Sequence, residues 1–230
     1  MPQKRRNNDD VRVVLKKIPK RTKEDKVELV QRIRQAIPNF DYVYVLGFQN
    51  GANALIKAAR KRWKDEGNNR SFFGKQKILA LALGKSEEDE LLPELHKLTA
   101  SLGGDSCLLL STSPKHVLLE QFDSLVQTTF ARPGEIATED VKLDEGLQLN
   151  FSNPVYILLH KMGWPVKKEQ GVVQLTQNFD VCSRGDVLTP EKCKALKLLG
   201  KKMSEFRIFI KGYWHANKFY DESRGLRNDK

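Results

Sequence analysis

Short apolar segments alternate with helical patterns along the first part of the chain, and this alternation restricts the fold more than any other feature. The segment YVYVLGF at 42–48 is β-branched and aromatic, which predicts a buried strand, and CLLLS at 107–111 has the same character. RSFFG at 70–74 predicts a shorter strand that ends at a glycine. Strands separated by helices favour a layered α/β domain.

Amphipathic spacing and start signals predict the helices. Thr22 and Asp25 form a capping-box pattern ahead of a helix whose apolar residues recur every three or four positions up to Pro38. A second helix places Trp63 on its apolar side and basic residues on the other. The segment KQKILALALG at 75–84 fits a strand or a helix. Further helices are expected over 86–102 and 153–163 and from Pro114 and Thr189 onward, and further strands over 171–179 and 205–211.

Positive charge is concentrated at the start of the chain. Residues 1–80 hold 20 Lys and Arg against 8 Asp and Glu, a net charge of +12, whereas residues 81–230 hold 20 against 21, a net charge of −1. The two parts together give the +11 of the whole chain. A basic first part joined to a neutral remainder predicts a surface that meets a polyanion such as nucleic acid.

The sequence offers little for catalysis or metal binding. Cys107, Cys182 and Cys193 are widely spaced without a C-x-x-C pair, so we expect reduced thiols rather than disulfides or a zinc site. Gly84-Lys85-Ser86 matches only the last part of a phosphate loop, because Leu79 stands where the first glycine is needed. We therefore expect no enzyme, no cofactor, no metal and no small-molecule substrate.

No signal points to a membrane. The chain contains no run of roughly 18 apolar residues, which a membrane-spanning helix requires. Its first residues lack the apolar stretch of a secretory signal. We therefore expect a soluble intracellular protein without a membrane partner.

The segment FFGKQK at 72–77 is the strongest candidate for contact with nucleic acid. A glycine after a strand lets the backbone approach a partner closely, and Lys75 and Lys77 place two ammonium groups there. If a helix follows, its first amides add attraction for phosphate. Lys57 and Arg60 on the basic side of the second helix, with a basic arm at residues 1–21, strengthen this prediction.

Several long motifs resemble one family. KRWKDEGNNRSFFGKQKILALALGKS, FARPG, GWPVKKEQGVVQL and VCSRGDVLTPEKCKALKLLGKKMSEFRIFIK are similar to the ribosome assembly factors called mRNA turnover protein four, relatives of the large-subunit ribosomal stalk-base protein. The similarity extends from about Lys26 to about Trp214. It implies a ribosomal-RNA-binding α/β domain, a smaller inserted α/β domain, and a helix from Lys75 onward. Together with the charged ends of the chain, it gives the expected division: a flexible basic arm at 1–21, an RNA-binding domain at 22–133 and 188–216, an inserted domain at 134–187, and a flexible charged tail at 217–230.

The resemblance and the charge pattern together give the expected RNA-binding residues. The family's RNA-facing turn corresponds to residues 73–77, where Gln76 replaces the usual asparagine, and Lys57 and Arg60 match basic residues of the family. The stretch VRVVLKKIPKRT departs from the family pattern, so contacts from the arm rest on charge alone. The complete expected set is Lys20, Arg21, Lys23, Lys26, Lys57, Arg60, Phe73, Gly74, Lys75, Gln76 and Lys77.

The resemblance also implies a function. Members of the family act in the nucleolus and nucleus on pre-60S particles, among the proteins of those particles, and occupy 25S/28S-type large-subunit rRNA at the future stalk base. The stalk protein replaces them after a phosphatase-related release factor promotes their departure, and passage to the cytoplasm with the particle stays open. Because the sequence ends at Lys230 without the acidic extension of the stalk protein, we expect a placeholder that recruits no translation factors.

Two alternatives belong to other classes of protein. A shortened stalk-base protein of the mature ribosome would be present on translating 80S particles, whereas an assembly factor would be confined to nuclear pre-60S particles. An RNA-processing or nucleotide-dependent enzyme is disfavoured, because the sequence supplies neither a phosphate loop nor an acid–base pair.

Overall fold

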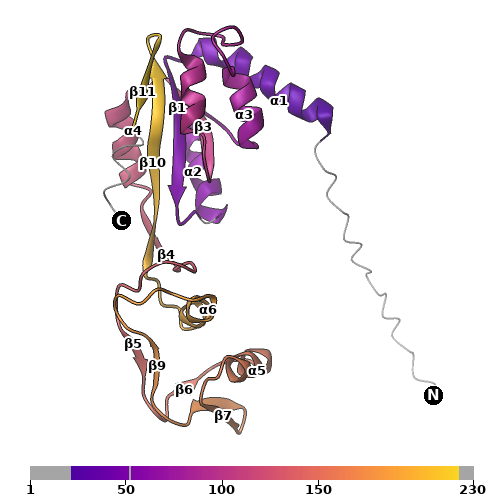
Figure 1. The fold of residues 1–230 in the computed structure, drawn as a ribbon. Helices are drawn as coiled ribbons and strands as arrows, with labels where there is room; N and C mark the ends of the chain where they lie inside the picture. The colour runs from indigo at the N-terminus through magenta and orange to yellow at the C-terminus, as the bar shows by residue number, and fades with distance from the viewer. Residues whose placement is uncertain (1–21, 52, 223–230) are drawn as a thin grey trace, which may run out of the picture.

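The fold consists of a sheet with helices on both faces and a smaller module beyond one end of that sheet (Figure 1). The structure is a computed structural model that describes residues 22–51 and 53–222. The expected basic arm at residues 1–21, with Lys20 and Arg21, lies outside the described residues, as does the end of the expected tail at 223–230. The fold confirms the prediction of a mixed α/β protein.

The main sheet joins strands from both ends of the chain. Its strand order is β11-β10-β1-β3-β2, and each neighbouring pair is antiparallel. The long strand β10 pairs with β1 in the middle of the sheet and, near its own start, with the short strand β4. The strands are β1 (Tyr42–Gln49), β2 (Asn69–Phe72), β3 (Ser106–Ser111), β4 (Gln127–Thr129), β10 (Ser204–His215) and β11 (Lys218–Asp221).

Both faces of the central strand β1 are covered, which explains its unbroken apolar sequence. Val43 and Val45 pack with one group of helices, and Tyr44 and Leu46 pack on the opposite face. The first face is covered by α1 (Lys23–Ala36), α3 (Gln76–Leu83) and the 3₁₀ helices η1 (Ile37–Asn39) and η2 (Leu95–Ser101). The second face is covered by α2 (Asn53–Asp65) and α4 (Lys115–Asp123).

The predicted capping box at the start of α1 is confirmed. The backbone N–H of Asp25 donates to Thr22 Oγ1 at 3.2 Å, and the N–H of Thr22 donates to Asp25 Oδ2 at 2.7 Å. Further along α1, Arg34 donates to the carbonyl of Leu81 at 3.0 Å and pairs with Asp89 at 2.9 Å. The hydrogen bond from Arg34 lowers the pKa of Asp89. Arg34 thus joins α1 to the end of α3 and to the loop that follows.

The segment 86–102 does not form the single helix that its sequence predicts. Only its last part is helical, as the 3₁₀ helix η2, and Leu91 is exposed. Pro93 interrupts the helical pattern because it has no N–H and disfavours helical geometry at the preceding residue. Glu94 then adopts a left-handed conformation with φ 62°. The Glu90 carboxylate accepts the N–H groups of Glu94 and His96, and its hydrogen bonds, first that with the His96 ring, lower its pKa.

The smaller module has its own apolar core, built around Leu159, Trp164 and Val173. Its two antiparallel sheets have the orders β5-β9 and β6-β8-β7. Its elements are β5 (Val141–Leu143), β6 (Gln148–Leu149), α5 (Asn153–Lys161), β7 (Val166–Glu169), β8 (Val172–Leu175) and β9 (Phe179–Cys182).

Two segments differ from the expected domain division. Helix α6 (Pro190–Leu198) buries Cys193, Ala195 and Leu196 in the core of the smaller module, although residues 188–216 were expected in the RNA-binding domain. The expected flexible tail begins instead with β11, which forms a hairpin with β10. Ala216 and Asn217 both have positive φ, at 48° and 61°, as the tightest hairpin turns require.

Candidate nucleic-acid interface

The turn at residues 73–75 connects the end of β2 to the start of α3. Lys75 is the N-cap of α3, with φ −64° and ψ 137°, and no side chain among the described residues caps the helix. The first amides of a helix have no partner within it and carry partial positive charge. The segment that fitted a strand or a helix is therefore a helix, and its start meets solvent beside two exposed lysines, Lys75 and Lys77.

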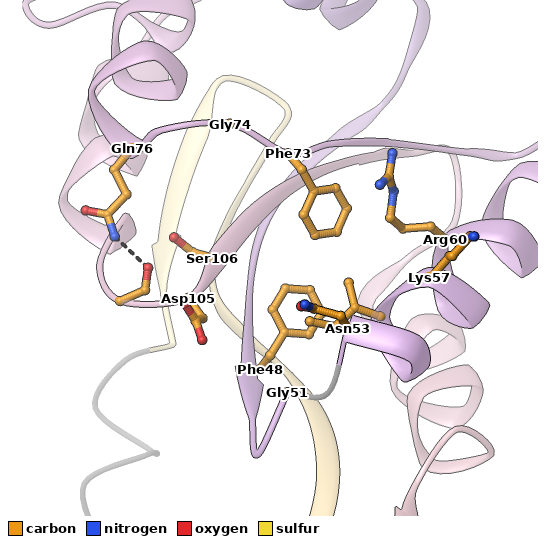
Figure 2. A pocket seen from close by; sticks show the side chains of 12 residues that line it. Phe48, Gly51, Asn53, Lys57, Arg60, Phe73, Gly74, Gln76, Asp105 and Ser106 are labelled. Carbon is orange, nitrogen blue, oxygen red and sulfur yellow. Dashed lines mark hydrogen bonds between the residues drawn. The ribbon is translucent and has the colours of Figure 1, made fainter. Parts of the chain in front are cut away.

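A hollow of about 530 Å³ lies on one side of this turn. Figure 2 shows Phe73 above it and Phe48 below it, with Lys57 and Arg60 of α2 on one side. Gln76, Asp105 and Ser106 lie on the opposite side (Figure 2). The hollow therefore combines aromatic, cationic and hydrogen-bonding groups from α2, the turn, α3 and the start of β3.

The aromatic side of the hollow is held by side chains that pack on one another. The Arg60 guanidinium carbon lies 4.6 Å from the centre of the Phe73 ring, a distance typical of a cation–π contact. The Phe73 and Phe48 rings are stacked with their centres 6.0 Å apart and their planes 22° apart. These contacts restrict Arg60 and Phe73 without any hydrogen bond between them.

Gln76 fixes the opposite side of the hollow. Its side-chain Nε2 donates to the carbonyl of Gly104 at 2.5 Å, drawn as a dashed line in Figure 2. This bond ties the start of α3 to the loop that precedes β3. An asparagine side chain is one methylene shorter, so the bridge to Gly104 is a feature of glutamine at this position.

A second hollow, of about 680 Å³, lies on the other side of the turn. Lys26 of α1 lines it together with residues 74–78 and Gly104. A Cβ at Gly74 would lie 3.1 Å from Leu29 Cδ2, which is a tight contact. Glycine therefore lets the turn approach α1 closely, and this approach brings Lys26 beside Lys75 and Lys77.

The structure thus brings most of the expected RNA-binding residues around one turn. Lys23 is exposed at the start of α1 and lines neither hollow. Lys20 and Arg21 lie outside the described residues. The first hollow is lined by Lys57, Arg60, Phe73, Gly74 and Gln76, and the second by Lys26, Gly74, Lys75, Gln76 and Lys77.

Sequence reasoning missed the residues that enter the hollow from β3 and from the start of α2. Asn53, Asp105 and Ser106 line the first hollow, and Arg32 lines a third hollow together with Arg60 and Phe73. Asp105 lies two residues before the predicted strand at 107–111. Because β3 runs antiparallel to β2, the start of β3 lies beside the end of β2, and pairing the two predicted strands in this way would have placed Asp105 near the turn.

The remaining features of the described residues concern metal ions, thiols and membranes. They contain no cluster of three or more His, Cys, Asp or Glu side chains placed to hold a metal ion. Cys107, Cys182 and Cys193 are buried free thiols, and burial raises the pKa of Cys107. Across residues 22–51 and 53–222, no helix has the length and apolar character to cross a membrane.

Two family models match the chain. Residues 21–126 match the model described as ribosomal protein L10, and residues 131–200 match a model described as the insertion domain in a 60S ribosomal protein of the L10 type. The first match covers α1 to α4 and the second covers the smaller module, including α6. The interval between the two matches contains β4.

Similar proteins are found over nearly the whole length of the chain. The ribosome assembly factor mrt4 of Dictyostelium discoideum is 33% identical over 210 residues, which cover 91% of this chain and 93% of that protein. The ribosome assembly factor mrt4 of Schizosaccharomyces pombe is 30% identical over 226 residues, with 93% and 91% covered. The large ribosomal subunit protein uL10 of Thermoplasma acidophilum is 25% identical over 203 residues, which cover 88% of this chain but 63% of that protein.

Proposed function

The chain belongs to the family of the ribosome assembly factor mrt4, and we propose that it holds the large-subunit ribosomal RNA at the future stalk base until the stalk protein takes its place. Membership of this family, which shares its domains with ribosomal protein L10, makes it a protein of large-subunit biogenesis. Binding to RNA and the role of placeholder are the further steps of the proposal.

One observation carries the RNA-binding step. Cationic side chains from three separate helices converge on the turn at residues 73–75, which also presents an uncapped helix start. Lys and Arg side chains that displace counterions from phosphates account for much of the affinity of proteins for nucleic acids. Recognition of folded RNA then depends on its shape and its 2′-hydroxyl groups. The converging cations are Lys26, Lys57, Arg60, Lys75 and Lys77.

The proposal extends to partners and place of action. The protein acts without catalysis, on pre-60S particles in the nucleolus and nucleus, in contact with other proteins of those particles. A phosphatase-related release factor ends its stay. We assign RNA contact to the discontinuous sheet domain at 22–133 and 188–216 without α6. This assignment leaves the module inserted at 134–187, together with α6, outside the RNA contact.

Competition tests the placeholder role. If the chain and uL10 occupy the same RNA surface, adding this chain to a complex of labelled uL10 with the stalk-base RNA fragment releases the uL10. Native gels should show either protein on the RNA and never both. A variant with Lys75→Glu and Lys77→Glu serves as the control and should release far less at the same concentration. A complex that holds both proteins at once on one fragment would contradict the proposal.

A further inference from the structure

Asp105 is unexpected in a hollow that faces RNA. Figure 2 shows its carboxylate on the side opposite Lys57 and Arg60, next to Ser106. The side chain is exposed and forms no salt bridge with another described residue, and Lys211 of β10, whose ammonium donates to the carbonyl of Gly103, acts on it electrostatically. A carboxylate only accepts hydrogen bonds and repels phosphate. Its position therefore suits a ligand group that donates hydrogen bonds.

Ser106 is the neighbour of Asp105 on this side of the hollow. Its Oγ is buried and has no hydrogen-bond partner among the described residues. Buried hydroxyl groups in native proteins usually have a partner, because leaving one without is costly. Ser106 lines the same hollow as Asp105, but its Oγ has almost no surface open to the hollow, so a ligand reaches this hydroxyl only after its χ1 rotates.

The remaining sides of the hollow suit a flat ring. The Phe73 ring, held by Arg60 and Phe48, borders the hollow. Proteins that recognise single-stranded parts of RNA commonly pack unstacked bases against aromatic rings and bind their edges through hydrogen bonds. The volume of about 530 Å³ is within the range of small-molecule sites.

Resting on the proposed function, we propose that this hollow binds one unstacked guanine base of the RNA. The base packs against Phe73, and the Asp105 carboxylate accepts hydrogen bonds from its N1–H and its exocyclic N2 amino group. Guanine alone among the four bases presents two adjacent donors on its Watson–Crick edge, which match the two oxygens of a carboxylate. The flanking phosphates lie toward Lys57.

The substitution Asp105→Asn tests the proposal through the sign of its effect. If the carboxylate binds guanine, replacing one oxygen by an amino group breaks the bidentate pair and weakens binding to the stalk-base RNA fragment by about 10- to 100-fold. If the carboxylate only repels phosphate, the same substitution removes a negative charge and tightens binding. Unchanged or tighter binding would overturn the proposal.

A matched control and modified RNA complete the experiment. Asp123→Asn, an exposed carboxylate at the end of α4, removes the same charge away from the hollow and should not weaken binding. The guanines of the fragment are then replaced one at a time by inosine, which lacks the N2 amino group. At one position this replacement should weaken binding by the wild-type protein and leave binding by the Asp105→Asn variant unchanged. Equal losses in both proteins at every position would contradict the base contact. Thermal midpoints check that both variants fold.

The two proposals fail in different ways. If the wild-type chain does not select the stalk-base fragment, the proposed function itself is wrong. If it selects the fragment, depends on Lys75 and Lys77, and yet loses nothing on Asp105→Asn, only the guanine site is wrong.

Discussion

Reversing the charge of Lys75 and Lys77 together should weaken binding to the stalk-base RNA fragment by about 10²- to 10³-fold near 0.15 M salt. The two side chains are exposed beside the start of α3, next to Gly74, where an added Cβ would lie 3.1 Å from Leu29 Cδ2 of α1. Each phosphate contact contributes about 0.7 to 0.9 to the slope of log affinity against log salt. Losing two contacts therefore costs roughly 10- to 30-fold at this salt, and replacing them by repulsion increases the loss further.

The salt dependence separates this explanation from damage to the fold. The double variant Lys75→Glu, Lys77→Glu should show a slope shallower by about 1.4 to 1.8 and an unchanged thermal midpoint. The matched control is Lys194→Glu with Lys197→Glu, two exposed lysines of α6 that make the same change in net charge. If this control loses as much affinity as the turn variant, the affinity depends on net charge alone and the turn has no special role.

The largest effect on stability is expected for Gly84→Ala. Gly84 ends α3 with φ 100° and ψ 140°, a conformation that is nearly restricted to glycine. A Cβ there would lie 2.7 Å from Glu90 Cα and 2.9 Å from Glu90 N, which are backbone atoms that cannot turn away. We expect a loss of about 3 kcal/mol or more in the free energy of unfolding, or a thermal midpoint lower by roughly 6–12 °C.

Gly67→Ala isolates the steric part of this effect. Gly67 also has a positive φ, at 73°, but no atom lies within 4 Å of the position its Cβ would take. It should cost only about 1 kcal/mol, because only backbone strain is introduced. The free energy of unfolding of both variants is measured by denaturant unfolding. Equal losses would contradict the explanation that Gly84→Ala clashes with the backbone of Glu90.

Local signals in the sequence predicted most of the individual elements. The capping box of α1, the buried strand β1 and the Thr189 cap of α6, which accepts the N–H of Lys192, follow from residue types and spacing alone. The prediction of one long helix over 86–102 was wrong because it followed the apolar spacing and neglected the helix-breaking effect of Pro93. Strand β11 was missed because Ala216 gives no turn signal, although Asn217 favours the left-handed conformation.

Long-range packing could not be predicted in the same way. The assignment of α6 to the smaller module depends on which core receives Cys193, Ala195 and Leu196, and the sequence of the helix does not specify this. For the site, charge and the glycine after β2 indicated the turn and its lysines. Asp105 was missed because a carboxylate carries no signal for RNA binding until antiparallel pairing places it across the hollow from Arg60.

The most direct test of the account is the choice that the purified chain makes between two RNAs. Its affinity for the stalk-base fragment and for an unrelated structured transcript of equal length should be measured at about 0.15 M salt, where non-specific attraction is reduced. The account predicts that the stalk-base fragment is bound at least about tenfold more tightly. Equal affinities for the two RNAs would contradict it.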